Sequence, residues 1–285
     1  MKNSYLGFIY MGITSLIWGL GYTFIKICTG IFDPFSLGLA RFIFSSILFL
    51  PFFLKNFRKI ESRDFLIIFI MALTGLTIYQ FFYNYGASGI SADLASILIS
   101  TEPIFILLLS YKIFKEKITK KLFGIMISFI GIIFVFYRGI GSINNTIDIS
   151  FILIASILWS IYTVISKTIL EKYDPMLVIS AVTIFGAITL LPFIPNMIHE
   201  IVKINSLELY SLIFLVVFGT FLAPYFNFKG LKLLIATNAG VFYYLSPFFT
   251  ILSAYIILNE NLSLTIIIGG ILIIGGVAMV DFTKS

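Results

Sequence analysis

The sequence predicts an all-α membrane protein of ten transmembrane helices, arranged as two inverted five-helix repeats with both termini inside the cell. Three observations predict this fold: an apolar composition, the placement of the basic residues and an internal repeat. Hydrophobic residues make up 60% of the 285 residues and charged residues only 11%, whereas soluble domains are about 45–50% apolar. A spanning helix uses about 20 apolar residues, so ten spans account for most of the chain.

Apolar runs interrupted by charges, Gly, Pro or Asn define the ten expected spans. Lipid offers the backbone no hydrogen-bond partners, so each run is expected to be helical. Transmembrane strands would instead show runs of about 10 residues with alternating hydrophobicity. The expected spans are residues 5–25, 35–54, 65–85, 94–111, 122–138, 150–166, 176–195, 209–228, 238–258 and 264–281.

The basic residues predict the orientation of these spans. With the N-terminus inside, 15 of the 19 Lys and Arg residues fall at the cytoplasmic face, and only Arg138 and Lys203 fall outside. Lys26 and Arg41 remain within spans or at their edges. Short cytoplasmic loops of membrane proteins are enriched in Lys and Arg. We therefore expect a multi-pass protein of the cell membrane with both termini cytoplasmic.

The two halves of the chain resemble each other at an offset of 141 residues, which becomes 144 after an insertion of three residues. The aligned pairs include rare residue types: Trp18 with Trp159, Lys26 with Lys167, Gly75 with Gly219, and Pro103 with Pro247. We therefore expect five-helix repeats over residues 1–140 and 150–285. Because five is odd, the second repeat crosses the membrane in the opposite sense. Secondary transporters are commonly built in this way, with substrate bound near the midplane between the repeats.

Short motifs recur in order along both halves. The first half carries Trp18-Gly19, Asp33-Pro34, Arg41-Phe42 and Glu102-Pro103-Ile104-Phe105, and the second carries Trp159, Asp174-Pro175, Ser246-Pro247 and Gly275-Gly276. Over nearly the whole chain, this series resembles the EamA-type repeat of the drug/metabolite transporter superfamily. The resemblance implies a ten-helix carrier for amino acids, their derivatives or other metabolites, with the third, fourth, eighth and ninth helices lining a central cavity.

Arg41 and Glu102 are the charged candidates for a site inside the membrane, where an ionisable side chain costs about 2.5–3.5 kcal/mol on insertion scales. Neither has a charged counterpart in the second repeat, where Val182 and Ser246 stand. Counted along their spans, they lie about 9 and 12 Å deep, so they could pair across the bundle. A static pair would reduce their desolvation cost. In a transport role, Glu102 would carry a proton or face a substrate amine, and Arg41 would bind a carboxylate or phosphate.

Polar aromatic and amide residues form a second group of binding candidates. They lie on one stripe of the third span, at the end of the eighth and at the start of the ninth: Tyr79, Gln80, Tyr83, Tyr225, Asn227, Tyr243 and Tyr244. An interfacial position is favoured for Tyr83 and Asn227, and a cavity position for Gln80 and Tyr244. Trp18 and Trp159 either stack on a substrate or pack the two repeats together.

Three prolines are hinge candidates. Pro103 and Pro247 each remove a helical hydrogen bond, which frees a carbonyl one turn earlier, at Ile99 and Tyr243. Pro224 adds a kink beside Tyr225 on the eighth span. Freed backbone can bind a ligand or act as a hinge, whereas the alternative is a static kink.

The motif content favours a secondary carrier over an enzyme. No Walker-type loop is present to bind ATP, and one Cys and one His leave little chemistry for a metal site or catalytic triad, so we expect no cofactor and no metal. The basic residues lie between apolar runs, which does not predict nucleic-acid binding. The expected partners are a small-molecule substrate, the lipid bilayer and, as an open alternative, a proton.

The leading hypothesis is a secondary transporter that exports or exchanges amino acids or related small metabolites by alternating access around a midplane cavity. A multidrug or organic-cation exporter is the first alternative, because Glu102 alone would serve it. A lipid-phosphate flippase, with Arg41 as the anion contact, is the second. Substrate, direction, coupling ion and oligomeric state stay open.

Overall fold

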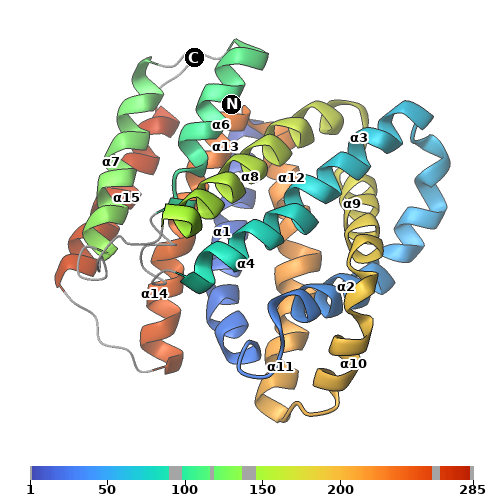
Figure 1. Ribbon diagram of the computed structural model, residues 1–285. Coiled ribbons are helices and arrows are strands. Elements are labelled where there is room, and N and C mark those ends of the chain that lie inside the picture. Colours follow the sequence, from blue (N-terminus) through green and yellow to red (C-terminus); the bar gives the residue numbers. More distant parts are fainter. Residues whose placement is uncertain (1, 90–97, 116–118, 137–145, 259–263, 283–285) are drawn as a thin grey trace.

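A computed structural model of the protein describes residues 2–89, 98–115, 119–136, 146–258 and 264–282 (Figure 1). Every regular element in these residues is helical. The α-helices are α1 (Lys2–Cys28), α2 (Pro34–Asn56), α3 (Ser62–Ala72), α4 (Ile78–Gly89), α6 (Glu102–Phe114), α7 (Thr119–Phe136), α8 (Thr146–Lys172), α9 (Pro175–Thr189), α10 (Ile194–Ile201), α11 (Ser206–Phe214), α12 (Ala223–Leu233), α13 (Ala236–Val241), α14 (Leu245–Leu258) and α15 (Leu264–Phe282).

Short segments of other helical types join some of these helices. In the described residues, three are 3₁₀ turns, at Phe57–Lys59, Leu191–Phe193 and Phe242–Tyr244. Two are π-helical segments, Leu73–Thr77 between α3 and α4, and Leu215–Leu222 between α11 and α12. At both π-helical segments the chain continues as one helix that is locally wider than an α-helix.

The structure confirms an all-helical membrane protein with several apolar spans. In the described residues, the stretches long and apolar enough to cross a membrane are Ser4–Cys28, Pro34–Lys59, Ser62–Gly86, Thr146–Lys172 and Ser206–Leu233. A sixth forms if Pro175–Thr189 and Leu191–Ile201, which meet at 53°, are one bent span. The expected spans 94–111, 122–138, 238–258 and 264–281 overlap α6, α7, α14 and α15. Shorter apolar helices are found there at Leu122–Phe134 and Ile268–Val277, so the count of ten stays a prediction.

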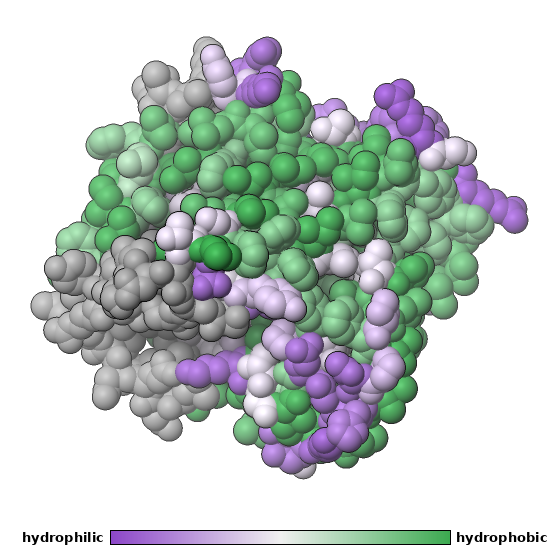
Figure 2. Space-filling model, viewed as in Figure 1, coloured by the Kyte–Doolittle hydropathy of each residue, from purple (hydrophilic) through white to green (hydrophobic). Residues whose placement is uncertain are grey.

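The surface is divided as a membrane protein requires. Figure 2 shows hydrophobic side chains across the middle of the visible face and hydrophilic ones gathered toward two opposite ends. The start of α1 and the end of α15 lie toward the same end of the molecule (Figure 1). Lys117, Arg138 and Lys284, which the charge count used, lie outside the described residues. The cytoplasmic placement of the termini remains a prediction.

The packing of the helices is reciprocal between the two halves. Helix α1 packs against α14 and against α11 and α12, and its counterpart α8 packs against α6 and against α3 and α4. Helices α2 and α9, which are each other's counterparts, contact each other, as do α7 and α15. A two-fold relation between the halves produces this pattern. It brings α1 and α8 to the centre, each surrounded by helices of the opposite half.

The repeated Asp-Pro pairs begin α2 and α9. The Asp33 carboxylate accepts the backbone N–H of Phe35 at 2.9 Å, and the Asp174 carboxylate accepts that of Met176 at 2.9 Å. Aspartate at the N-cap satisfies free N–H groups at the start of a helix. Proline suits the next position because the N–H that it lacks would have no partner there.

Helices α7 and α15 approach each other closely at glycines. A Cβ atom placed on Gly276 would lie 2.6 Å from the Gly124 carbonyl oxygen and 2.6 Å from the Ser128 backbone nitrogen. Backbone atoms cannot move away as the end of a flexible side chain can, so only glycine fits at position 276. Close approach at small residues is a common way for helices to associate in membranes.

Gly276→Ala is therefore expected to destabilise the protein by about 1–3 kcal/mol, the usual cost of overpacking. Its neighbour Gly275 provides a matched control, because nothing lies within 4 Å of a Cβ atom there. Gly275→Ala is expected to be neutral or slightly stabilising, since alanine favours helices. Thermal unfolding of the two detergent-purified variants makes the comparison, and equal melting temperatures would contradict the close approach.

Candidate functional site

The π-helical segments widen the two helices that pack against α8 and α1. They occupy matching places in the two halves, since Gly75 and Gly219 are aligned and each lies within one of them. In a π-helix each N–H donates to the carbonyl five residues earlier, so Pro224, which has no N–H, leaves the Gly219 carbonyl free. The indole Nε1 of Trp18 donates to this carbonyl at 3.2 Å. The widened segment thus fixes the orientation of the Trp18 ring.

Aromatic rings from both halves meet beside this point. Trp18 lies edge-on to Trp159 with ring centroids 5.6 Å apart, and Tyr243 contacts both at 5.9 and 6.2 Å. Tyr79 contacts Trp159 at 5.3 Å and stacks on Tyr83 at 5.8 Å with an interplanar angle of 9°. We call these five residues the aromatic cluster. It combines candidates from the first, third, sixth and ninth expected spans.

Glu102 lies beside the aromatic cluster and is 8% exposed. Its carboxylate is within electrostatic range of the phenol groups of Tyr79, Tyr83 and Tyr243. Within the described part of the chain, no hydrogen bond or ion pair is recorded for this carboxylate. Ser160 of α8 donates to the Glu102 backbone carbonyl at 3.1 Å, which ties the start of α6 to α8. Glu102 is therefore a buried acidic group near several phenols, and the described residues provide no hydrogen-bond or ion-pair partner for its carboxylate.

Arg41 does not pair with Glu102, contrary to the expected static pair. Its Nε donates to the Thr220 hydroxyl at 3.1 Å, and among the described residues no ion pair joins it to Glu102. The depth estimate assumed a continuous fourth helix, whereas the chain turns at Ser100 and Thr101 and α6 begins at Glu102. Arg41 instead lies beside the π-helical segment whose Gly219 carbonyl holds Trp18.

Four other candidates occupy different places. Asn227, for which the sequence favours an interfacial position, is 1% exposed and accepts the Tyr243 hydroxyl at 3.0 Å. The amide of Gln80 lies against Gly38 of α2, where a Cβ atom would be 3.0 Å from its oxygen. Tyr225 lines a separate pocket at the ends of the helices. Tyr244 is buried, and its hydroxyl has no recorded partner within the described residues.

The three prolines lie near the starts of α6, α14 and α12, where the helix type changes or the helix begins. Pro103 is the second residue of α6, and the Ile99 carbonyl accepts the Ser156 hydroxyl at 3.5 Å. Pro247 follows the 3₁₀ turn Phe242–Tyr244 at the start of α14, and Pro224 is the second residue of α12. The predicted kinks are thus changes of helix type, while a hinge role stays a prediction.

The structure adds residues that sequence analysis missed. Tyr22 is within electrostatic range of both Arg41 and Glu102. Tyr162 contacts the Trp159 ring at 5.0 Å. Helical spacing was the available signal, since Tyr22 follows Trp18 by four residues and Tyr162 follows Trp159 by three, which places each pair on one face.

A polar network ties the two halves together at the end of the molecule that carries the start of α3. The Asp64 carboxylate is 1% exposed and accepts the Tyr173 hydroxyl at 2.7 Å and the Lys172 ammonium at 3.0 Å. The Tyr173 hydroxyl also accepts the Glu61 backbone N–H at 3.1 Å, and Lys232 donates to the Tyr173 carbonyl at 3.0 Å. Helix α3 of the first half is thereby bonded to the end of α8 in the second.

The fold and this geometry define a class: a multi-helical membrane protein whose two halves both contribute side chains to one aromatic and acidic centre. Comparison with known proteins identifies the family of this chain within that class. The model of the EamA-like transporter family matches residues 5–137 and again residues 146–281. The chain therefore belongs to the EamA-like transporter family, and it is a membrane transporter and not an enzyme.

Several known proteins are similar to this chain along most of their length. An uncharacterized transporter of Archaeoglobus fulgidus is 31% identical, over 95% of this chain and 97% of the relative. The uncharacterized transporter YdfC of Bacillus subtilis is 27% identical, over 92% and 86%. A probable terminal-alkyne amino-acid exporter of Streptantibioticus cattleyicolor is 23% identical, over 94% and 91%. A crystal structure at 18% identity superposes with a TM-score of 0.77, over 98% of this chain and 96% of the other, which shows a shared fold.

The Asp64 network gives a stability prediction. Tyr173→Phe removes one donor from a buried carboxylate, which is expected to lower the free energy of unfolding by about 1–3 kcal/mol. Tyr210→Phe is the control, because Tyr210 is 70% exposed. Thermal unfolding in detergent should show a clear drop for the first variant and none for the second. An unchanged melting temperature for Tyr173→Phe would contradict the importance of this tie between the halves.

Proposed function

We propose that this transporter is a secondary carrier that moves a small amine-bearing metabolite, such as an amino acid or a derivative, by alternating access. Glu102 and the aromatic cluster form the proposed substrate site. One observation carries the proposal: Glu102 is buried at the meeting point of the halves, and its carboxylate has no recorded partner in the described residues.

A positively charged amine is the ligand that this surrounding best suits. A buried carboxylate without a partner is costly, because it loses hydration without compensation. An ammonium group would supply both hydrogen bonds and an opposite charge. Aromatic rings within about 6 Å attract a cation through the negative face of the ring, and Trp18, Trp159 and Tyr79 offer such rings from both halves.

Arg41 supports a substrate that also carries a carboxylate. Among the described residues its guanidinium donates to Thr220, other N–H groups of the guanidinium could serve an anion, and arginine binds carboxylates through two parallel bonds. Tyr22 lies within electrostatic range of both Arg41 and Glu102. The two charges would then recognise the two ends of a zwitterion. The amino-acid exporter among the relatives, although only 23% identical, agrees with this class.

The reciprocal packing of the halves supports alternating access. In the proposed arrangement the repeats are inverted and both termini are cytoplasmic, as the positive-inside rule favours. Rocking of the halves around the central site would expose it to each side in turn. The Asp64 network would close the cytoplasmic side, since Lys172 and Tyr173 belong to one half and Asp64 to the other. A proton on Glu102 is the proposed alternative occupant when the substrate has left.

An organic-cation exporter is the second candidate function. The aromatic cluster and Glu102 would satisfy a hydrophobic cation without any help from Arg41. The two candidates differ in whether the carboxylate of the substrate matters. They are separated by measuring transport of an amino acid and of a hydrophobic quaternary amine in the same vesicles.

Glu102→Gln removes the charge while keeping the size of the side chain. It is expected to reduce transport of the amine-bearing substrate about tenfold or more, because a hydrogen bond to a charged group contributes about 1.5–3 kcal/mol. It should also flatten the pH dependence of transport. The readout is uptake into proteoliposomes at several pH values, with the exposed Glu171→Gln as control. Unchanged rate and pH profile in Glu102→Gln would remove Glu102 from the mechanism.

A further inference from the structure

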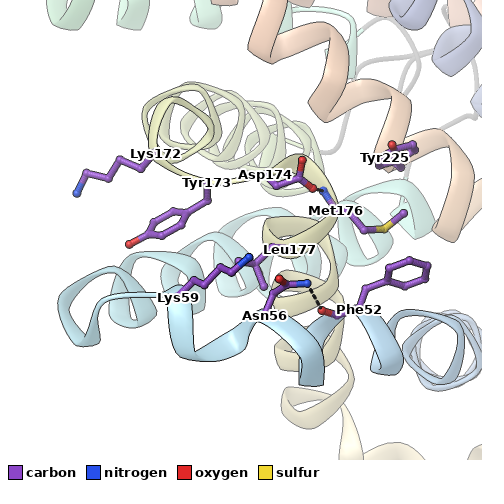
Figure 3. A pocket seen from close by; sticks show the side chains of 9 residues that line it. All are labelled: Phe52, Asn56, Lys59, Lys172, Tyr173, Asp174, Met176, Leu177 and Tyr225. Carbon is purple, nitrogen blue, oxygen red and sulfur yellow. Dashed lines mark hydrogen bonds between the residues drawn. The ribbon is translucent and has the colours of Figure 1, made fainter.

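A pocket of about 680 Å³ lies apart from the central site, between the ends of α2, α8, α9 and α12. Its lining mixes positive, polar and apolar side chains: Phe52, Asn56, Lys59, Lys172, Tyr173, Asp174, Met176, Leu177 and Tyr225 (Figure 3). Lining of this kind suits an amphipathic ligand. The proposed substrate site does not include this pocket, although two of its lining residues, Lys172 and Tyr173, also belong to the Asp64 network.

Lys59 supplies the positive charge that a ligand would meet. Figure 3 shows its ammonium group extending into the space beside Leu177, whereas the Lys172 side chain runs away from Phe52 and Tyr225. Lys172 is paired with Asp64 at 3.0 Å, and within the described residues no ion pair is recorded for Lys59. The Asp174 carboxylate accepts the Met176 N–H at the start of α9, where the helix dipole offsets its charge.

The position of the pocket indicates where its ligand comes from. Leu48 and Phe52 lie one turn apart on α2 and are 40% and 42% exposed, so they form part of the lipid-facing surface that leads to the pocket. Lys55 and Arg58 continue the same end of α2 and are also exposed. The opening therefore lies where an apolar, lipid-facing surface ends and basic side chains begin. That is the level of phospholipid headgroups.

We propose that this pocket binds the headgroup phosphate of an anionic phospholipid of the cytoplasmic leaflet, with Lys59 as its principal charge partner. The Asn56 amide already donates to the Phe52 carbonyl at 3.2 Å and keeps a second N–H for a headgroup oxygen. Phe52, Met176 and Leu177 contact the glycerol and the upper acyl chain. A bound lipid would also touch Lys172 and Tyr173, which belong to the Asp64 network.

The test compares the full-length protein in nanodiscs of phosphatidylcholine alone and of phosphatidylcholine with phosphatidylglycerol. Phosphatidylglycerol is expected to raise the melting temperature, and native mass spectrometry should detect it as a retained lipid. Lys59→Gln should weaken retention about fivefold, the equivalent of one basic residue near an anionic surface. Lys55→Gln is the matched control, since Lys55 is exposed in the last turn of α2, four residues before Lys59, but does not line the pocket.

Three results would overturn the proposal. Equal losses in the two lysine variants would show that diffuse charge, and not this pocket, attracts the lipid. No preference for phosphatidylglycerol would remove the lipid altogether. A melting shift in detergent with inorganic phosphate or glycerol phosphate, as large as that with the lipid and lost in Lys59→Gln, would assign the pocket to a free anion.

Discussion

The buried carboxylate of Glu102 is the interaction centre on which the organisation of this protein depends. In a chain with 60% hydrophobic residues, an acidic side chain with no recorded protein partner carries an energetic penalty that packing alone does not offset. The surroundings fit that constraint. The phenol groups of Tyr79, Tyr83 and Tyr243 lie within electrostatic range of the carboxylate, and Ser160 ties the Glu102 backbone to α8. A cationic ligand would supply the hydrogen bonds and the opposite charge for the Glu102 carboxylate.

Residues that are matched between the two halves and residues that are not matched have different places in the structure. Matched residues build the frame: the Asp-Pro pairs begin α2 and α9, Gly75 and Gly219 lie in the π-helical segments, and Trp18 and Trp159 contact each other. Unmatched residues give the centre its charges, since Val182 and Ser246 stand at the second-half positions of Arg41 and Glu102. A nearly symmetric frame thus holds an asymmetric site. In the proposed function, the same asymmetry would distinguish the two ends of one substrate.

Much of this arrangement could be predicted from the sequence, and the reasons for the remainder are physical. Apolar runs predicted the long spans because a helix that crosses lipid needs a long apolar stretch. The repeated Trp and Pro residues indicated the region where the two halves meet. The sequence did not show that the chain turns at Ser100 and Thr101, because an apolar stretch has the same composition whether it is one helix or two. The depth estimate that paired Arg41 with Glu102 failed for that reason. The sequence also did not show that Tyr225 lines a separate pocket or that Gln80 lies against Gly38, because helical spacing specifies a face of a helix but not the neighbour that this face contacts.

The central claim is that substrate binds among the aromatic cluster and Glu102, and intrinsic fluorescence tests it directly. The chain has two tryptophans, Trp18 and Trp159, and their rings lie 5.6 Å apart in the cluster, so all tryptophan emission comes from the proposed site. Titration of the purified protein with an amine-bearing substrate should change this emission saturably, and Glu102→Gln should abolish the change. Transport of that substrate with no change in tryptophan emission at saturating concentration would contradict the account.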